Sequence, residues 1–294
     1  MLSFEAGPRP VRPTYDENER QPYRRIAPEP MSPTVGAEIG GVSLSEPIDA
    51  DTFDEIHRAL LEYKVIFFRD QDITPEQHVA FARRFGALET HPFVPHREGY
   101  PEVMVLKKND RIGGYENVWH SDVTWRLEPS LGSVLLARDV PAVGGDTLFC
   151  DMYAAYEGLD DALRASLDGL HAVHDFSRTF GRFMSAEELA KKQEEFPPAT
   201  HPVVRTHPET GRKGLYVNAA FTAHVVDMDP GESDRLLARL YRQAVVPEYQ
   251  CRFRWRRHSV AFWDNRAVQH YAASDYYPSR RVMERVTIIG DKPY

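Results

Sequence analysis

Trp119-His120-Ser121-Asp122 places an imidazole and a carboxylate two positions apart. Side chains alternate between faces along an extended segment, so we expect His120 and Asp122 to point the same way. Together they can supply two of the three ligands of a 2-His-1-carboxylate iron site, which leaves metal positions open. A His-x-Asp sequence also occurs on loops by chance, so the pattern needs support from the rest of the chain.

Length and composition suit a large globular protein. The chain has 294 residues, of which 42% are hydrophobic and 11% aromatic, enough for a substantial core. The formal net charge of -8 and the pI of about 5.9 argue against a nucleic-acid partner. Cys150 and Cys251 lie far apart and match no zinc or redox spacing, which suggests a reducing compartment.

The sequence shows neither a membrane span nor a secretory signal. No apolar run approaches the roughly 18 residues of a membrane span. The first residues, MLSFEAGPRPVRPTYDENERQPYRR, contain no apolar core of a secretory signal. We therefore expect a soluble cytoplasmic protein with no membrane partner.

The chain divides into an arm and one domain. Residues 1–30 are rich in Pro, Arg and Glu and lack periodicity, so we interpret them as an extended N-terminal arm. Residues 31–294 contain no repeat and no low-complexity linker, which indicates a single domain. An arm that wraps a neighbouring subunit of a homo-oligomer, a dimer or tetramer, is compatible with this pattern, and the sequence does not decide it.

Hydrophobic periodicity predicts a mixture of strands and helices. A helix is expected after Asp49 and Asp51, another from Thr74 to Gly86, and helical structure dominates 151–196. The other predicted elements are buried strands at Val65–Phe68, Val103–Leu106, Leu131–Arg138, Thr147–Phe149, Ser259–Trp263 and Val282–Ile289, a hairpin around Glu209-Thr210-Gly211, and a helix at Glu232–Val245. One α+β domain with a β-sandwich or barrel core and helical insertions fits this order.

The last predicted strand carries two arginines on one face. With a period of two, Arg281, Met283 and Arg285 share a face, and the two arginines lie roughly 13 Å apart at about 3.3 Å per residue. A guanidinium that points into a core needs an anionic partner, and its planar fork suits carboxylate, sulfonate or sulfate. The alternatives are exposed arginines, or arginines paired with acids such as Asp264 or Asp275.

His270 ends the stretch Trp263-Asp264-Asn265-Arg266-Ala267-Val268-Gln269-His270. A lone histidine beside aromatic residues is more often a core residue than a ligand, so the local pattern alone does not make it a third metal ligand. Its position 11 residues before Arg281 gives it context.

Eight stretches of the chain resemble the taurine dioxygenase family of iron(II)- and 2-oxoglutarate-dependent oxygenases. They are GAEIGGVSL, VIFFRDQDITPEQ, THPFVPHREG, WHSDVTW, GGDTLF, HPVVRTHPETG, FWDNRAVQHYA and RRVMERVTIIGDKP. They run from about Val35 to Pro293, nearly the whole chain after the arm. The resemblance implies a double-stranded β-helix (jelly-roll) core with helical insertions.

The resemblance also implies roles for individual residues. The metal ligands would be His120, Asp122 and His270, and no further catalytic residue is expected. For 2-oxoglutarate, Arg281 would bind the distal carboxylate, with Thr147 assisting. For the primary substrate, Arg285 and His91 would bind the anionic group, and Phe180 and Phe221 would wall the pocket. Thr147, Phe180 and Phe221 also suit ordinary strand or core positions.

The implied cofactors are Fe(II), 2-oxoglutarate and O2, and the implied partner is a small-molecule substrate. Decarboxylation of 2-oxoglutarate to succinate and CO2 would accompany hydroxylation of a small organosulfur acid, taurine or another alkylsulfonate. Hydroxylation at the carbon next to sulfur would release sulfite and an aldehyde.

Two positions depart from the pattern of the taurine-specific members. Val94 stands in place of a tyrosine, which leaves a more apolar wall, and Glu116 stands in place of an asparagine. We place both in the substrate pocket, where Glu116 either pairs with an ammonium or lies at the surface. Taurine specificity is therefore open.

Other functions also remain open from the residues. The same chemistry would serve an alkyl sulfate ester or a carboxylic acid. A zinc hydrolase with the same three ligands leaves Arg281 and Thr147 unexplained, and no His-Glu-x-x-His is present. A non-enzymatic β-sandwich binding protein is a further alternative.

Overall fold

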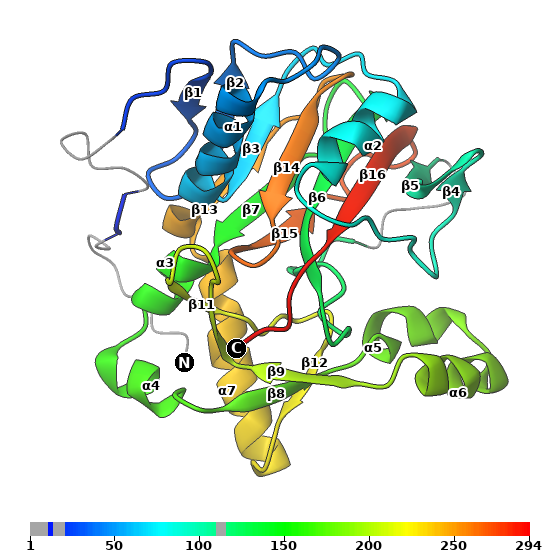
Figure 1. Cartoon of the computed structure of the whole chain (residues 1–294). Coiled ribbons are helices and arrows are strands. Elements are labelled where there is room, and N and C mark those ends of the chain that lie inside the picture. Colours follow the sequence, from blue (N-terminus) through cyan, green and yellow to red (C-terminus); the bar gives the residue numbers. More distant parts are fainter. Residues whose placement is uncertain (1–10, 14–20, 110–115) are drawn as a thin grey trace.

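Two β-sheets packed face to face form the centre of this computed structural model, which describes residues 11–13, 21–109 and 116–294 (Figure 1). The large sheet has the order β1-β2-β3-β14-β6-β16-β5-β4, and a smaller sheet has the order β13-β7-β15. The bounds in the large sheet are β1 Ala27–Pro30, β2 Ala37–Gly40, β3 Val65–Phe68, β4 His96–Arg97, β5 Tyr100–Lys108, β6 Ser130–Asp139, β14 Val260–Asp264 and β16 Arg281–Ile289. Those in the smaller sheet are β7 Thr147–Asp151, β13 Gln250–Phe253 and β15 Val268–Ala272.

Strand β3 is buried on both faces, which explains its unbroken apolar sequence. Val65 and Phe67 face the smaller sheet, where the ring of Phe67 stacks on that of Phe253 with centroids 4.0 Å apart. Ile66 and Phe68 belong to the core on the opposite face of the large sheet. A strand covered on both sides has no solvent-facing position for a polar residue.

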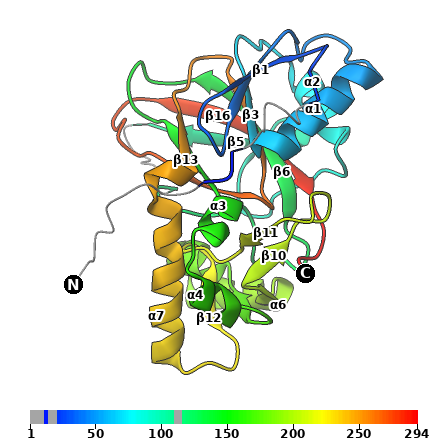
Figure 2. The same ribbon diagram turned by 90° about the vertical axis from the view of Figure 1, so that its left-hand side faces the viewer.

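Helices α1 (Ala50–Tyr63) and α2 (Pro75–Arg83) cover the outer face of the large sheet (Figures 1 and 2). Asp49 caps α1 by accepting from the backbone N–H of Thr52. Thr74 and Gln77 form a reciprocal capping box at the start of α2, which supplies partners for backbone N–H groups that the helix leaves unpaired. Both predicted helix starts are confirmed.

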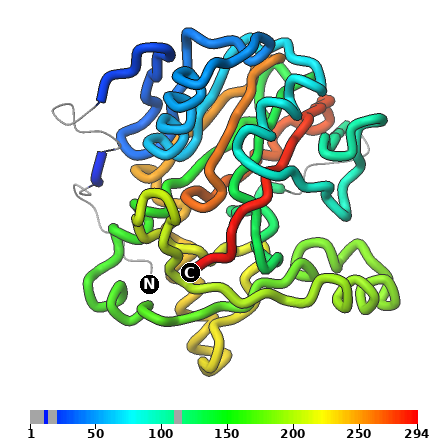
Figure 3. Tube along the Cα trace, in the orientation of Figure 1, coloured from blue at the N-terminus to red at the C-terminus, as the bar shows by residue number. Residues whose placement is uncertain are grey.

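Besides the two packed sheets and the helices α1 and α2, a further layer of the molecule lies below the large sheet (Figure 3). It contains the three-stranded sheet β12-β8-β9 and most of the remaining helices. The bounds are β8 His171–His174, β9 Ala199–Pro202, β12 Thr222–Val225, α3 Met152–Glu157, α4 Asp161–Ser166, α5 Ser177–Phe180, η1 Gly181–Phe183, α6 Ala186–Glu195, α7 Pro230–Tyr241, η2 Arg242–Val245 and η3 Pro247–Tyr249. Strand β8 interrupts the region 151–196 that we predicted as helical, because four residues, His-Ala-Val-His, are too short to show a period.

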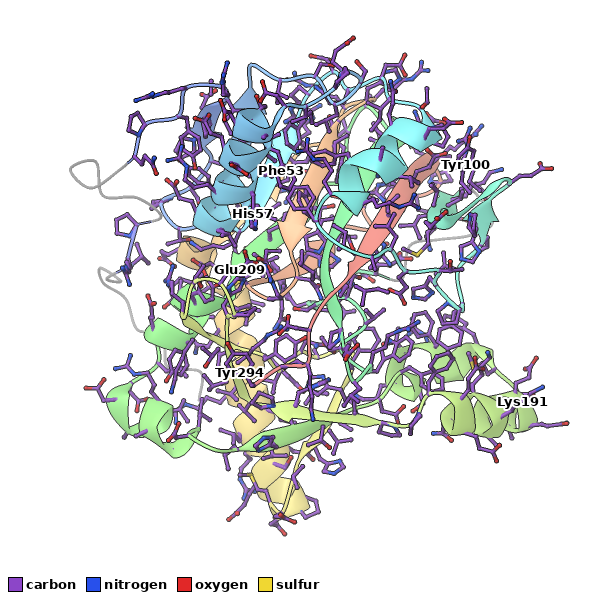
Figure 4. All side chains as sticks on the ribbon, viewed as in Figure 1. Phe53, His57, Tyr100, Lys191, Glu209 and Tyr294 are labelled. Carbon is purple, nitrogen blue, oxygen red and sulfur yellow. The ribbon has the colours of Figure 1, made fainter. Side chains whose placement is uncertain are left out.

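The predicted hairpin joins this lower part to α1. Strands β10 (Val204–Thr206) and β11 (Lys213–Leu215) pair antiparallel around Glu209-Thr210-Gly211. The Oε2 atom of Glu209 lies 2.9 Å from Nε2 of His57 on α1, and Figure 4 labels both residues. The hairpin prediction is confirmed.

The fold confirms the α+β class and bears on the boundary of the arm. Residues 27–30, which we assigned to the arm, form β1 and pair antiparallel with β2. Residues 1–10 and 14–20 lie outside the described part of the chain, so the extended arm and the homo-oligomer stay predictions. Across the described ranges, none of the helices has the length and apolar character needed to cross a membrane.

His78 makes the fold sensitive to acid. It lies fully buried on α2, with Nε2 2.9 Å from the carbonyl oxygen of Val134 on β6, and burial lowers its pKa from 6.5 to about 4. Between these values the unfolded chain binds a proton that the folded chain does not, so stability falls as the pH falls below 6.5.

Between pH 7 and pH 5, we expect the free energy of unfolding of the parent to fall by about 2 kcal/mol more than that of His78→Gln. Urea unfolding at pH 7, 6 and 5 measures the difference. Equal pH slopes for the two proteins would show that His78 does not titrate in this way.

Candidate metal centre and adjoining cavities

Backbone pairing brings His120 and His270 together from distant parts of the chain. Each donates its N–H to the carbonyl of the other, with N···O distances of 3.1 and 2.8 Å, which makes an isolated antiparallel bridge. Ser121 strengthens this contact by donating from Oγ to the carbonyl of Val268, 2.8 Å away. The two imidazole rings therefore lie side by side, with centroids 4.1 Å apart.

Asp122 is fixed by the amide of Asn265. The Oδ1 atom of Asn265 accepts the backbone N–H of Asp122 at 2.6 Å, and its Nδ2 donates to the Asp122 carbonyl at 2.9 Å. Asp122 begins a turn in which Val123 has a φ of +46°, so our expectation of an extended segment is correct only as far as Ser121. The side chains of His120 and Asp122 nevertheless face each other, as that expectation required.

The three predicted ligands converge. Asp122 Oδ1 lies 3.9 Å from Nε2 of His120 and 4.0 Å from Nε2 of His270. All three candidate ligand atoms lie within 4.8 Å of one another, and all three residues are buried. The spacing and the burial give one shared position that a single cation can occupy.

The surroundings of the three predicted ligands suit a divalent metal. His120 Nδ1 lies 2.8 Å from the Val118 carbonyl and donates to it, which leaves the lone pair on Nε2. Burial and the neighbouring His120 lower the pKa of His270 well below its usual value, so this ring is neutral. Burial acts to raise the pKa of Asp122, but the charge of the neighbouring Arg285 outweighs it and keeps the carboxylate ionised.

This donor set fits ferrous iron. Two neutral imidazoles and one carboxylate on one side of a cation are typical of oxygenase iron centres, which keep open positions for further ligands. Ser133 donates from Oγ to Oδ2 of Asp122 at 3.1 Å, so the carboxylate presents Oδ1 to the histidines.

Arg281 lies buried between aromatic rings beside this centre. Its guanidinium carbon is 5.9 Å from the ring centroid of Trp255 and 5.8 Å from that of Tyr276. Within the described residues it pairs with no carboxylate and its Nε has no hydrogen-bond partner, and burial lowers its pKa. A buried guanidinium in this condition fits an anionic ligand.

The loop Gly144-Gly145 lies against Arg281. A Cβ atom on Gly145, whose φ is +72°, would lie 3.3 Å from Cδ of Arg281 and 3.2 Å from the ring of Tyr276. Asp275 fixes the loop by accepting the Gly145 N–H at 2.8 Å. Glycine is therefore needed both for the backbone conformation and for the close approach.

Thr147 lies in the same small cavity as Arg281. The cavity has a volume of about 50 Å³, and His120 and His270 line it too. The Thr147 hydroxyl accepts from Trp255 Nε1 at 2.9 Å, so its own hydrogen is available to a ligand. The structure thus places both predicted 2-oxoglutarate residues beside the metal position.

A larger cavity of about 270 Å³ adjoins the first and shares His120 and Arg285 with it. All six predicted substrate residues line it: His91, Val94, Glu116, Phe180, Phe221 and Arg285. Within it, Arg285 Nη1 lies 2.8 Å from Oδ1 of Asp122. The alternative partners Asp264 and Asp275 are engaged elsewhere, Asp264 with Arg266 and Asp275 with the Gly145 loop.

His91 is a neutral hydrogen-bond donor in this cavity. Its Nδ1 accepts the backbone N–H of Phe93 at 3.1 Å, so the ring hydrogen lies on Nε2. Burial and the charge of Arg285 lower the pKa of His91 to about 3. The ring stays uncharged at neutral pH and can donate to an anion.

Glu116 forms an ion pair in the wall shared by the two cavities. Its Oε1 lies 2.7 Å from Nζ of Lys108, and both residues line both cavities. The sequence suggested that Glu116 either pairs with a ligand ammonium or lies at the surface. Neither interpretation included its ion pair with Lys108.

Sequence reasoning missed four residues that shape the centre: Asn265, Ser133, Lys108 and Gly145. Asn265 lies within FWDNRAVQHYA and Gly145 within GGDTLF, stretches already singled out for other residues. Ser133 and Lys108 carry no signal, because their contacts depend on which strands become neighbours.

The chain is similar to known proteins over most of its length. Residues 28–287 match the family described as "Taurine catabolism dioxygenase TauD, TfdA family". The chain is 36% identical to an alpha-ketoglutarate-dependent sulfate ester dioxygenase of Pseudomonas putida, covering 90% of this chain and 89% of that protein. It is 34% identical to an alkylsulfatase of Acinetobacter baylyi, covering 92% and 87%. A crystal structure of a taurine dioxygenase from Burkholderia xenovorans superposes with a TM-score of 0.81 at 39% identity, covering 92% and 93%.

The Asn265 contact predicts a loss of metal affinity. We expect Asn265→Ala to weaken Mn(II) binding by about 10- to 100-fold, because Asp122 loses the amide that fixes its backbone. Titration of the variant with Mn(II), followed by the signal of the free ion, measures the effect.

Asn218→Ala is the matched control. Asn218 is an equally buried amide that contacts Thr124 and the backbone of Phe221, not a predicted ligand. It should lower stability and leave Mn(II) affinity unchanged. Equal metal affinity in Asn265→Ala and the parent would show that the clamp does not position Asp122.

Proposed function

The chain belongs to the TauD, TfdA dioxygenase family, and from that premise we propose that its primary substrate is an organosulfur acid with an uncharged apolar chain. The protein is a 2-oxoglutarate-dependent dioxygenase that uses Fe(II) and O2, which decides against a zinc hydrolase and a non-enzymatic binding protein. When bound, these cofactors supply the oxidation, and the protein supplies position and charge.

We assign the metal ligands to His120, Asp122 and His270 on the convergence of their ligand atoms. We assign the distal carboxylate of 2-oxoglutarate to Arg281, assisted by Thr147, on the burial and lack of a carboxylate partner described above. The two packed sheets, with the site between them, are consistent with the double-stranded β-helix that the resemblance implies.

The anionic group of the substrate would bind between Arg285 and His91. Arg285 offers a planar pair of donors, and His91 offers a neutral donor from Nε2. Three oxygens of a sulfonate or sulfate can accept from both side chains at once. A carboxylate has fewer acceptors, so the sulfur oxyanions use this pair of donors more fully.

The rest of the cavity suits an alkyl chain. Phe180 and Phe221 stack with ring centroids 6.4 Å apart, and Val94 and Val118 extend the apolar wall. Burial of each CH2 group there contributes about 0.8 kcal/mol to binding. Taurine has only two carbons and gains little from such a wall.

The Lys108–Glu116 ion pair is the observation that carries the choice against taurine. An ammonium at the substrate tail would have to compete with Lys108 for the Glu116 carboxylate, 2.7 Å away. An alkyl chain makes no such demand. We therefore favour alkylsulfonates and alkyl sulfate esters, in keeping with the similarity to the Pseudomonas sulfate ester dioxygenase and the Acinetobacter alkylsulfatase.

The products follow from where the hydroxyl is placed. Hydroxylation of the carbon that bears the sulfur group gives an unstable product in either case. A 1-hydroxyalkylsulfonate loses sulfite and becomes an aldehyde, whereas a 1-hydroxyalkyl sulfate loses sulfate and becomes the same aldehyde. Succinate and CO2 form in equal amounts with the aldehyde.

A substrate comparison tests this proposal. We expect hexane-1-sulfonate or hexyl sulfate to drive succinate formation, with kcat/KM at least about tenfold above that for taurine, because of the chain burial and the occupied Glu116. Assays of sulfite and sulfate identify the leaving group. Taurine turnover as efficient as that of both hexyl compounds would contradict the proposal.

Separate substitutions test the two arginines. Arg281→Ala should raise KM for 2-oxoglutarate, and Arg285→Ala should raise KM for the sulfur substrate, each by about thirtyfold or more, because each removes one member of a buried charge pair. Initial rates with each substrate varied in turn measure both constants.

Arg280→Ala is the matched control for these variants. Arg280 is adjacent in sequence, but its side chain is 62% exposed and pairs with Asp139 at the surface. It should change neither KM. If Arg281→Ala and Arg285→Ala raised KM for the same substrate, the division of roles between them would be wrong.

A further inference from the structure

We propose that Arg285 links substrate binding to metal binding, because Asp122 and the substrate anion share its guanidinium. The inference rests on the proposed function, which places the anion at Arg285. It adds a thermodynamic coupling to that site: a bound anion raises metal affinity, and a bound metal raises anion affinity.

Arg285 and the two imidazoles all face one oxygen atom, Oδ1 of Asp122. Asp122 Oδ1 accepts from Arg285 Nη1 at 2.8 Å. The same Oδ1 faces both imidazoles, 3.9 Å from Nε2 of His120 and 4.0 Å from Nε2 of His270. A metal ion held by these three residues and the guanidinium of Arg285 therefore address the same atom.

The carboxylate is fixed from two directions, so it cannot offer Arg285 another oxygen. Ser133 donates to Oδ2 at 3.1 Å, and Asn265 holds the backbone N–H and carbonyl of Asp122. Turning the carboxylate would break the Ser133 hydrogen bond. When a metal ion and the guanidinium compete for Oδ1, the side chain of Arg285 must therefore move, because the carboxylate of Asp122 cannot.

The Arg285 side chain is held more weakly than Asp122. Apart from Asp122, the described residues give it one hydrogen-bonding contact, from Nη2 to the Met104 sulfur at 3.8 Å, and its Nε has no partner. It lines the substrate cavity of about 270 Å³. A long side chain with one strong contact can turn toward an anion that enters this cavity.

The charges set the sign of the coupling. A divalent cation at Oδ1 repels the guanidinium, whereas a sulfonate or sulfate attracts both. An anion that pairs with Arg285 therefore removes a competitor for Asp122 and screens the repulsion. By thermodynamic reciprocity, the metal improves anion binding by the same factor.

Anaerobic Mn(II) titration tests the coupling without turnover. Free Mn(II) is followed by electron paramagnetic resonance, in the absence of 2-oxoglutarate, with butane-1-sulfonate or with chloride at equal ionic strength. We expect butane-1-sulfonate to raise the Mn(II) affinity of the parent about fivefold or more. In Arg285→Leu we expect tighter Mn(II) binding than in the parent without the anion, and no further gain when the anion is added.

Two further variants make the result specific. Arg182→Leu removes another arginine that lines the same cavity and has no ion pair with Asp122 among the described residues, so the anion effect should persist. Arg285→Gln keeps a polar side chain and should behave as Arg285→Leu does, which preserves the test if the leucine variant does not fold.

Calorimetry with butane-1-sulfonate separates the two ways of failing. If the anion binds the parent and Mn(II) affinity stays the same, the coupling is overturned and the proposed function stands. If the anion does not bind the parent at saturating Mn(II), the assignment of Arg285 to the substrate fails, and the coupling fails with it. Persistence of the anion effect in both Arg285 variants would also overturn the coupling.

Discussion

The mutual backbone hydrogen bonds of His120 and His270 are the contact on which the centre depends. They join a loop that follows β5 to the strand β15, and they set the two imidazoles side by side before any metal is considered. Ser121 and Asn265 extend the same seam and bring Asp122 to the third position. Because backbone groups, the Ser121 hydroxyl and the Asn265 amide make these contacts, the side chains of the three proposed ligands remain available for a metal.

Three buried or partly buried charged residues, Asp122, Arg281 and Arg285, lie around the contact between His120 and His270. Asp122 is a buried carboxylate, and the two arginines of β16 have different surroundings. Arg281 lies between aromatic rings in the small cavity, whereas Arg285 lies against Asp122 and lines both cavities. The arrangement leaves one guanidinium without a carboxylate partner in the described part of the chain and the other with a shared one. Both guanidinium positions therefore favour anions, but an anion at Arg281 would meet no competing carboxylate, whereas an anion at Arg285 would share the guanidinium with Asp122.

Much of this could be predicted from the sequence, for definite reasons. The apolar run of β3, the caps of α1 and α2 and the alternation of β16 are local signals that the fold preserves. Residue pattern and resemblance together also pointed to the residues that line both cavities. What they missed depends on tertiary contacts: the Asn265 clamp, the Lys108–Glu116 pair, and the turn at Val123, where a β-branched residue takes a positive φ that local preference disfavours.

The helical segment α5–η1–α6 has a consequence for how such enzymes diversify. It contains no buried residue, yet Phe180 at the end of α5 reaches the substrate cavity. The proposed metal ligands and the two arginines proposed to bind anions come from other elements. Under the proposed function, replacement of this peripheral segment by another sequence would reshape the cavity wall and leave the proposed metal ligands unchanged, so that specificity and chemistry would evolve on separate parts of the polypeptide.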